Sequence, residues 1–155
     1  RRADEIIDGD PNTFYLSGGT RNDTRNYPHE IQISFPQSVA MSGLILMPRQ
    51  NQREHQGDIR DYQISASDDD ANWSEIARGK LASTFDEQKI IFPKIIRAKF
   101  LRLTAFSGFG GDHSASLAEL AVIDASEKLA GRSSGDVEYK NVRTASPDID
   151  AGATQ

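Results

Sequence analysis

Short apolar segments separated by glycine, proline and aspartate run through most of this chain, and no stretch holds a helical apolar period over three turns. In residues 31–35, Ile, Ile and Phe alternate with Gln and Ser, and Pro36 follows. This alternation is typical of a half-buried strand that a proline ends. Many such short strands predict an all-β fold, a β-sandwich or barrel.

The other apolar segments support the same fold class. Residues 41–47 are almost continuously apolar and stop at Pro48, which predicts a strand buried on both faces. Polar residues alternate with apolar ones again in 62–66 and 101–105, and shorter strands are predicted at 89–92, closed by Pro93, and at 120–122. The acidic segment 67–72 predicts a turn that leads to Trp73.

Length and composition exclude several functional classes. The chain has 155 residues, enough for one domain, and a formal charge of −5, which disfavours nucleic acid as a partner. No apolar run approaches the ~20 residues of a membrane span. The absence of cysteine excludes disulfides and thiolate metal sites.

We predict one domain over residues 1–124. Residues 125–155 contain few large apolar residues, which predicts a linker or extended tail. Val137, Tyr139 and Val142 could anchor one strand that pairs back on the domain.

The segment Asp8–Tyr15 (DGDPNTFY) combines two carboxylates, a hydroxyl and a turn fixed by Gly9 and Pro11. Oxygen groups held this way suit calcium, which takes 6–8 oxygen ligands. Glu119 lies in an apolar segment, where an unpaired carboxylate is costly to bury, so a shared cation would join the two ends of the domain. The alternative is an ordinary turn, because the spacing of an EF-hand is absent.

Other polar motifs indicate no chemistry of their own. His29, His55 and His113 are too scattered for a local zinc motif, and His29 is expected to be structural. No serine lies in a Gly-x-Ser-x-Gly motif. The run Asp68–Asp70 is expected to be a solvated turn.

Six segments, in this order, resemble the discoidin family, also called the coagulation factor V/VIII C-type domain. Within that family the chain is most similar to bacterial family 32 carbohydrate-binding modules. The similarity covers residues 6–124, and the segments are DGDPNTFY (8–15), YPHEIQI (27–33), MPRQN (47–51), DYQISAS (61–67) with Trp73, AKFLRLTA (98–105) and ASLAELAV (115–122). The resemblance implies a jelly-roll β-sandwich that binds and does not catalyse.

The resemblance also implies a structural calcium ion. Its ligand positions in this chain are Asp8, Asp10, Thr13 and Glu119, with backbone carbonyls near Glu5 and Ala118. A cation there would pin the first loop to the last strand of the domain and would stabilise the native state by binding to it alone.

For the sugar site, the resemblance points to Arg49 and to the polar loop that follows, including Asn51 and Glu54. Phe106 and Phe109 lie in the late loop from which an aromatic ring stacks on the sugar in this family. We expect Phe109 to be the more exposed of the two because glycines flank it. The alternatives are core packing for Phe106 and, for Arg49, a buried ion pair with an acid such as Asp61.

Galactose-binding members have a histidine, and then a tryptophan, after the equivalent of Phe14-Tyr15. This chain has Leu-Ser-Gly-Gly at 16–19, which leaves open another sugar, a modified or sulfated glycan, or a vestigial site.

The first hypothesis is therefore a non-catalytic carbohydrate-binding module that binds galactose-type or modified glycans. It would belong to a larger secreted bacterial enzyme, a glycoside hydrolase or another polysaccharide-active enzyme. The alternative is a structural or protein-interaction domain on the same fold. A small enzyme is disfavoured because no nucleophile or acid–base pair is evident.

Overall fold

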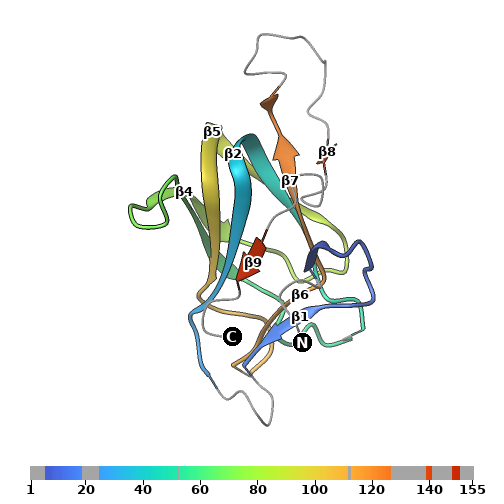
Figure 1. Ribbon diagram of the computed structural model, residues 1–155. Helices are drawn as coiled ribbons and strands as arrows, with labels where there is room; N and C mark the ends of the chain where they lie inside the picture. The colour runs from blue at the N-terminus through green and yellow to red at the C-terminus, as the bar shows by residue number, and fades with distance from the viewer. Residues whose placement is uncertain are drawn as a thin grey trace.

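The computed structural model describes residues 6–18, 25–51, 53–111, 113–126, 139–140 and 148–150. It is an all-β domain, and the predicted fold class is confirmed (Figure 1). The strands are β1 (Tyr15–Ser17), β2 (His29–Met47), β3 (Asp61–Ser67), β4 (Ser74–Lys80), β5 (Gln88–Ala105), β6 (Ala115–Leu117), β7 (Glu119–Asp124), β8 (Tyr139–Lys140) and β9 (Asp148–Asp150). Among these residues, no helix is long and apolar enough to cross a bilayer.

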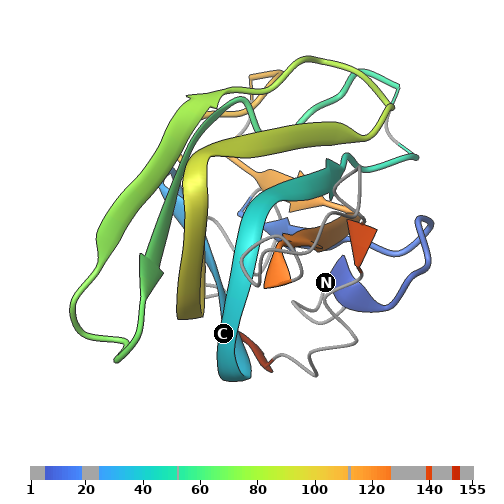
Figure 2. The same cartoon turned by 90° about the horizontal axis from the view of Figure 1, so that it is seen from above.

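Two long strands, β2 and β5, turn a corner together and give the domain its shape (Figure 2). Their register is interrupted between Ser34 and Val39, and again between Met41 and Gly43. The predicted strand ends at Pro36 and Pro93 are therefore wrong, since both prolines lie inside a strand, at residues absent from the paired register. A proline is tolerated there because no ladder hydrogen bond requires its missing N–H.

The corner folds one seven-stranded sheet into two layers. Its order is β4-β3-β5-β2-β7-β8, and β9 also pairs with β2. Strand β3 pairs with residues 100–105 of β5, whereas β7 pairs with residues 41–47 of β2. A second sheet of two strands, β1 and β6, joins the two ends of the domain. The two short strands of the predicted tail pair with β7 and β2.

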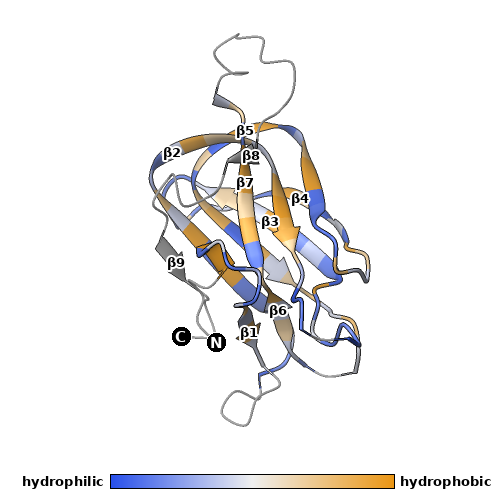
Figure 3. Cartoon of the chain, turned by 90° about the vertical axis from the view of Figure 1, so that its right-hand side faces the viewer, coloured by the Kyte–Doolittle hydropathy of each residue, from blue (hydrophilic) through white to orange (hydrophobic). Residues whose placement is uncertain are grey.

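The core lies between the layers. Along β2, Ile31, Ile33 and Phe35 are buried while Glu30 and Gln32 face outward, as the alternation predicts (Figure 3). Burial of each such side chain contributes about 1.5–3 kcal/mol. Strand β4 was not predicted, because its sequence SEIARGK carries charges and a glycine at the edge of the sheet.

Candidate functional site

The candidate sugar site lies at the end of the domain where β3 begins and β5 ends. Backbone hydrogen bonds join the two loops there: the Gly57 N–H donates to the Phe109 carbonyl at 3.0 Å, and the Phe109 N–H donates to the Asp58 carbonyl at 2.9 Å. Ile59 and Gly108 form an antiparallel bridge beside them. The two loops, residues 48–51 with 53–60 and residues 106–111, which we name the sugar loops, therefore have a fixed relative position.

Gly108 is required in this arrangement. The Tyr27 side chain packs against its α-carbon, so that a β-carbon at residue 108 would collide with the Tyr27 hydroxyl. The same hydroxyl donates a short hydrogen bond to the Ser114 carbonyl. At Gly110 a β-carbon would likewise collide with the Gln56 side chain, so the two glycines next to Phe109 serve close packing.

Arg49 is half-buried and held in one orientation. Its guanidinium carbon lies 3.9 Å from the centroid of the buried Phe14 ring. Its Nε donates to Asn51 Oδ1 at 2.6 Å. A guanidinium stacked in this way is pre-organised to bind further acceptors, such as vicinal sugar hydroxyls.

Arg49 also acts on Asp58. Burial is the largest effect and raises the pKa of the Asp58 carboxyl above its ordinary value, whereas the hydrogen bond and charge of His55 and, last, the charge of Arg49 lower it. Asp61, the acid considered as a partner from the sequence, instead accepts a short hydrogen bond from the Ser107 hydroxyl. Of the other predicted residues on this loop, Asn51 contacts Arg49 and Glu54 is exposed.

The two late-loop phenylalanines differ in exposure, in the opposite sense to the prediction. Phe106 is 45 % exposed, whereas Phe109 is only partly exposed. The Phe109 backbone is paired with Gly57 and Asp58, and the Arg60 guanidinium carbon lies 5.9 Å from its ring centroid. Phe106 is therefore the more exposed ring, and the expectation that Phe109 would be the more exposed of the two is wrong, because Gly108 and Gly110 serve close packing and do not open the loop.

Two residues at this end of the domain, His55 and Phe85, were not identified as site residues from the sequence. The ring centroids of His55 and Phe85 are 4.2 Å apart, and Phe85 is 39 % exposed. His55 Nδ1 lies 2.9 Å from Asp58 Oδ2, so the buried carboxyl orients the imidazole. Gln50 Nε2 donates to the Phe85 carbonyl at 2.9 Å, which fixes the 81–87 loop next to Arg49.

These contacts supply an imidazole and an exposed aromatic ring near Arg49. Leu16, which follows Phe14-Tyr15 where the family pattern has its histidine, carries no ring and is paired with Ser116 in the two-stranded sheet. No local sequence signal links His55 to Phe85, which are thirty residues apart.

The predicted cation loop, residues 8–14, crowds several oxygens together. The Thr13 hydroxyl oxygen lies 2.6 Å from Asp8 Oδ2 and 2.9 Å from the Asp10 carbonyl oxygen. One hydroxyl hydrogen can serve only one of these acceptors well. The Asp10 carboxylate accepts from the Asn12 N–H at 2.9 Å through its Oδ1.

The sheet register brings this loop toward the other predicted cation ligands. Tyr15 pairs with Leu117, so the same register continued two residues further places Thr13 toward Glu119. Glu119 Oε1 is shielded from solvent, and the Ala118 N–H donates to the Met47 carbonyl at 2.9 Å. Among the described residues, however, no group of three or more carboxylate or imidazole side chains is gathered around one point. Glu5 lies outside the described residues.

Two other motifs have structural roles. His29 is buried, with Nδ1 2.8 Å from Ser17 Oγ and Nε2 2.6 Å from the His113 carbonyl oxygen. In the acidic turn, hydrogen bonds from the Asn72 and Ala71 backbone hold the pKa of Asp69 well below its usual range. This turn is therefore organised by a carboxylate that sequence reasoning treated as merely solvated.

With this geometry established, comparison with known proteins identifies the family. The model of the F5/8 type C domain family matches residues 2–120. The chain belongs to the F5/8 type C domain family. The predicted resemblance to discoidin domains is thereby confirmed.

Curated relatives are much longer proteins. A sialidase of Micromonospora viridifaciens is 34 % identical over 122 residues, covering 78 % of this chain and 18 % of the sialidase. A galactose oxidase of Gibberella zeae is 28 % identical over 129 residues, covering 83 % of this chain and 19 % of the oxidase. The chain thus spans less than a fifth of the length of either relative.

Solved structures of Clostridium perfringens modules share the fold. One, solved in complex with GalNAc-β-1,3-galactose, superposes with a TM-score of 0.68 at 26 % identity, covering 76 % of this chain and 80 % of that chain. A family 32 carbohydrate-binding module in complex with galactose gives a TM-score of 0.68 at 26 % identity, covering 77 % of this chain and 82 % of that chain. The similarity to family 32 modules is therefore present in both sequence and fold.

Proposed function

We propose that this domain is a non-catalytic carbohydrate-binding module that binds galactose-type or modified glycans with its sugar loops. The observation that carries the proposal is that Arg49, oriented by Phe14 and Asn51, lies beside the loop of the exposed Phe85 ring, to which the Gln50 side chain is hydrogen-bonded. A guanidinium gives directional hydrogen bonds to sugar hydroxyls, and an exposed ring covers the C–H face of a pyranose. Similar modules bind galactose and GalNAc-β-1,3-galactose, which supports this ligand class.

In this proposal His55 and Phe85 replace the missing histidine and tryptophan of galactose-binding members. The Asp58 carboxyl holds the His55 ring, so that its other nitrogen can face a hydroxyl of the sugar. Phe85 and Phe106 are the candidate stacking rings because they are the exposed ones. Asn51 positions Arg49, and Glu54 is a further acceptor on the rim.

We further propose that the domain holds a structural calcium ion. The candidate ligands are the Asp8 carboxylate, the Thr13 hydroxyl, the Asp10 carbonyl, Glu119 and the carbonyl of Ala118, with Glu5 nearby in sequence. The crowded oxygens around Thr13 fit a hard cation, which would bind all of them at once. The ion would link the cation loop to the start of β7.

The domain is proposed to belong to a larger secreted enzyme, since its curated relatives are a sialidase and an oxidase of which it matches a small part. A single shallow site binds weakly, and ~1 mM corresponds to only about 4 kcal/mol. Tethering to an enzyme compensates for this by raising the local concentration at the glycan.

Isothermal titration calorimetry with galactose and with GalNAc-β-1,3-galactose, in calcium-containing buffer, tests the sugar site. We expect millimolar or tighter binding by the parent domain, and loss of that heat in Arg49→Ala. Arg53→Ala, a change to an exposed arginine of the same loop, should bind normally. A folded parent domain that gives no heat with either sugar would contradict the proposal and favour a protein-interaction domain.

A further inference from the structure

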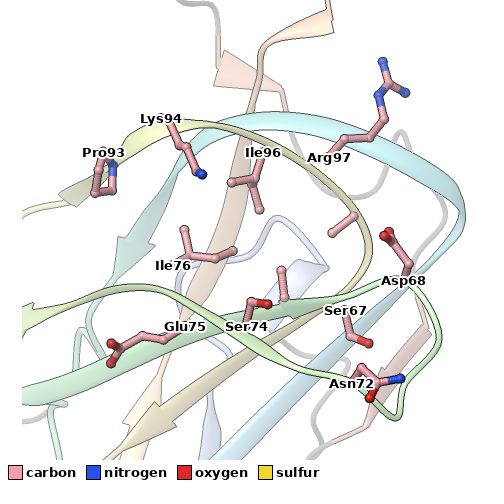
Figure 4. A pocket seen from close by; sticks show the side chains of 12 residues that line it. Ser67, Asp68, Asn72, Ser74, Glu75, Ile76, Pro93, Lys94, Ile96 and Arg97 are labelled. Carbon is pink, nitrogen blue, oxygen red and sulfur yellow. The ribbon is translucent and has the colours of Figure 1, made fainter.

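A hollow with a volume of about 390 Å³ lies at the opposite end of β3 and β4 from the sugar loops. It is formed by the end of β3, the start of β4 and the corner of β5 (Figure 4). Strand β3 has seven residues, so roughly 20 Å separate the two ends. The volume is within the ~300–1,000 Å³ typical of small-molecule sites.

The floor of this hollow is aliphatic. Ile76 and Ile96 face each other across it, and Ala66 and Ala98 also line the hollow. None of the twelve lining residues is aromatic. The floor therefore lacks the flat ring that stacks on a pyranose, but it suits a small alkyl group such as a methyl.

The rim is polar and offers both donors and acceptors. The Lys94 side chain extends over the hollow with its ammonium directed toward the isoleucines, whereas Arg97 and Glu75 point away (Figure 4). Glu75 is instead paired with Arg78, whose Nε donates to Glu75 Oε1 at 2.6 Å. Among the described residues, Lys94 has no ion-pair partner within 4 Å. Asp68, Asn72 and Ser74 complete the rim.

An aliphatic floor, one ammonium donor and a carboxylate acceptor match the three parts of an acetamido group: its methyl, its carbonyl and its N–H. We propose that this hollow is a second saccharide site, which binds the N-acetyl group of an acetamido sugar residue. The methyl would pack on Ile76 and Ile96, the carbonyl would accept from Lys94, and the amide N–H would donate to Asp68. This site is independent of the sugar loops.

The proposal is tested by residue-resolved ¹H–¹⁵N NMR titration with N-acetylgalactosamine and, separately, galactose, both at millimolar concentration. We expect N-acetylgalactosamine alone to shift the amide signals of Ser74, Ile76 and Lys94. Amides of the sugar loops report separately on the proposed function. Absence of shifts in the hollow, or equal shifts with both sugars, would overturn the second site whatever the sugar loops do.

Variants sharpen the test. Lys94→Met removes the donor at an exposed position and should weaken binding in the hollow about tenfold. Lys99→Met, on the same strand but outside the hollow, is the matched control and should change nothing. Ser74→Phe should fill the hollow and abolish its shifts, with the sugar-loop signals confirming an intact fold. Shifts that survive both Lys94→Met and Ser74→Phe would overturn the proposal.

Discussion

The cation loop and the sugar loops are both short, polar and attached to the same sandwich, yet they are built in different ways. The cation loop is one contiguous segment, and hydrogen bonds within it join Asp8 to Asp10, Asp10 to Asn12 and Asp8 to Thr13, residues two to five apart. The sugar loops join residues from several segments, and the contact of His55 with Phe85 spans thirty positions. We infer that the first can be recognised in sequence as a motif, whereas the second depends on the fold.

The two regions should also fail differently when they are altered. Changes to the cation loop should reduce stability, because a cation that binds only the native state adds to its free energy of unfolding. Changes to the exposed residues of the sugar loops should reduce affinity and leave stability nearly intact. The predictions below separate these outcomes, beginning with the largest expected effect.

Removal of calcium should produce the largest change in stability. At a calcium concentration a hundredfold above Kd, binding contributes about 2.7 kcal/mol, so a chelator should lower Tm by roughly 10 °C. Asp8→Asn should lower Tm in calcium to a similar degree, whereas Glu87→Gln, at an exposed acid elsewhere, should not. Differential scanning calorimetry measures both. A Tm that is unchanged by chelator and by added calcium would contradict the calcium site.

Arg49→Lys should have the largest effect on affinity. Lysine keeps the charge but loses both the planar stack on Phe14 and the fork of N–H donors, so galactoside affinity should fall more than tenfold. Titration calorimetry of Arg49→Lys beside Arg53→Lys makes the comparison. Equal affinity of the two variants would show that the oriented guanidinium is not part of the site.

Phe106 and Phe109 test, within one loop, the distinction between a loss of sugar affinity and a loss of stability. Phe106→Ala should reduce sugar affinity several-fold and leave Tm within about 2 °C of the parent, since the ring is already exposed. Phe109→Ala should cost about 1–2 kcal/mol of stability because its ring is largely covered. Thermal melts of both variants measure the change in stability, and titrations with sugar measure the change in affinity. The reverse assignment, with binding lost only in Phe109→Ala, would restore the prediction made from sequence.

Acid pH should weaken sugar binding through Asp58. Burial raises the pKa of this carboxyl above 3.8, so its protonation begins at a higher pH than for an ordinary aspartate. As pH falls, the folded protein takes up this proton before the unfolded chain does, so protonation of Asp58 favours the native state. The same protonation removes the carboxylate that accepts from the His55 ring. Affinity should therefore drop before the fold is lost. Asp58→Asn should remove that pH dependence, and an unchanged affinity profile would contradict the role of His55.

The smallest effect is expected at the acidic turn. The pKa of Asp69 is lowered, chiefly by the hydrogen bond from the Asn72 backbone N–H, so its contribution to stability is present above pH 3.8 and is lost as pH falls further. Asp69→Asn should lower Tm slightly at neutral pH, less so in acid, and should leave sugar affinity unchanged. A large effect on binding would show that this turn belongs to the site.

Much of the fold was predictable because alternation and turn residues are local signals. Residues 31–35 and 41–47 were correctly placed in strands, and the family resemblance was recognised from ordered segments. The continuity of β2 through Pro36 was not predictable, because it depends on a corner where the pairing of β2 with β5 is interrupted. Edge strand β4 was missed since it buries few apolar side chains.

The candidate site was predictable only in part, because it depends on contacts between segments that are distant in the sequence. Arg49 follows a recognisable strand end, but which of Phe106 and Phe109 has the more exposed ring depends on how the 106–111 loop packs against its neighbours. The roles of His55 and Phe85 depend on three loops meeting at one end. Such convergence has no signature in any single segment.

The most direct test is a glycan array probed with the multivalently displayed domain in calcium, beside the same display of Arg49→Ala. The proposed function predicts that the parent domain binds a coherent set of galactose-type or acetamido glycans and that Arg49→Ala loses the galactose-type set. A folded parent domain that binds nothing, or a variant with an unchanged profile, would contradict sugar recognition by these loops.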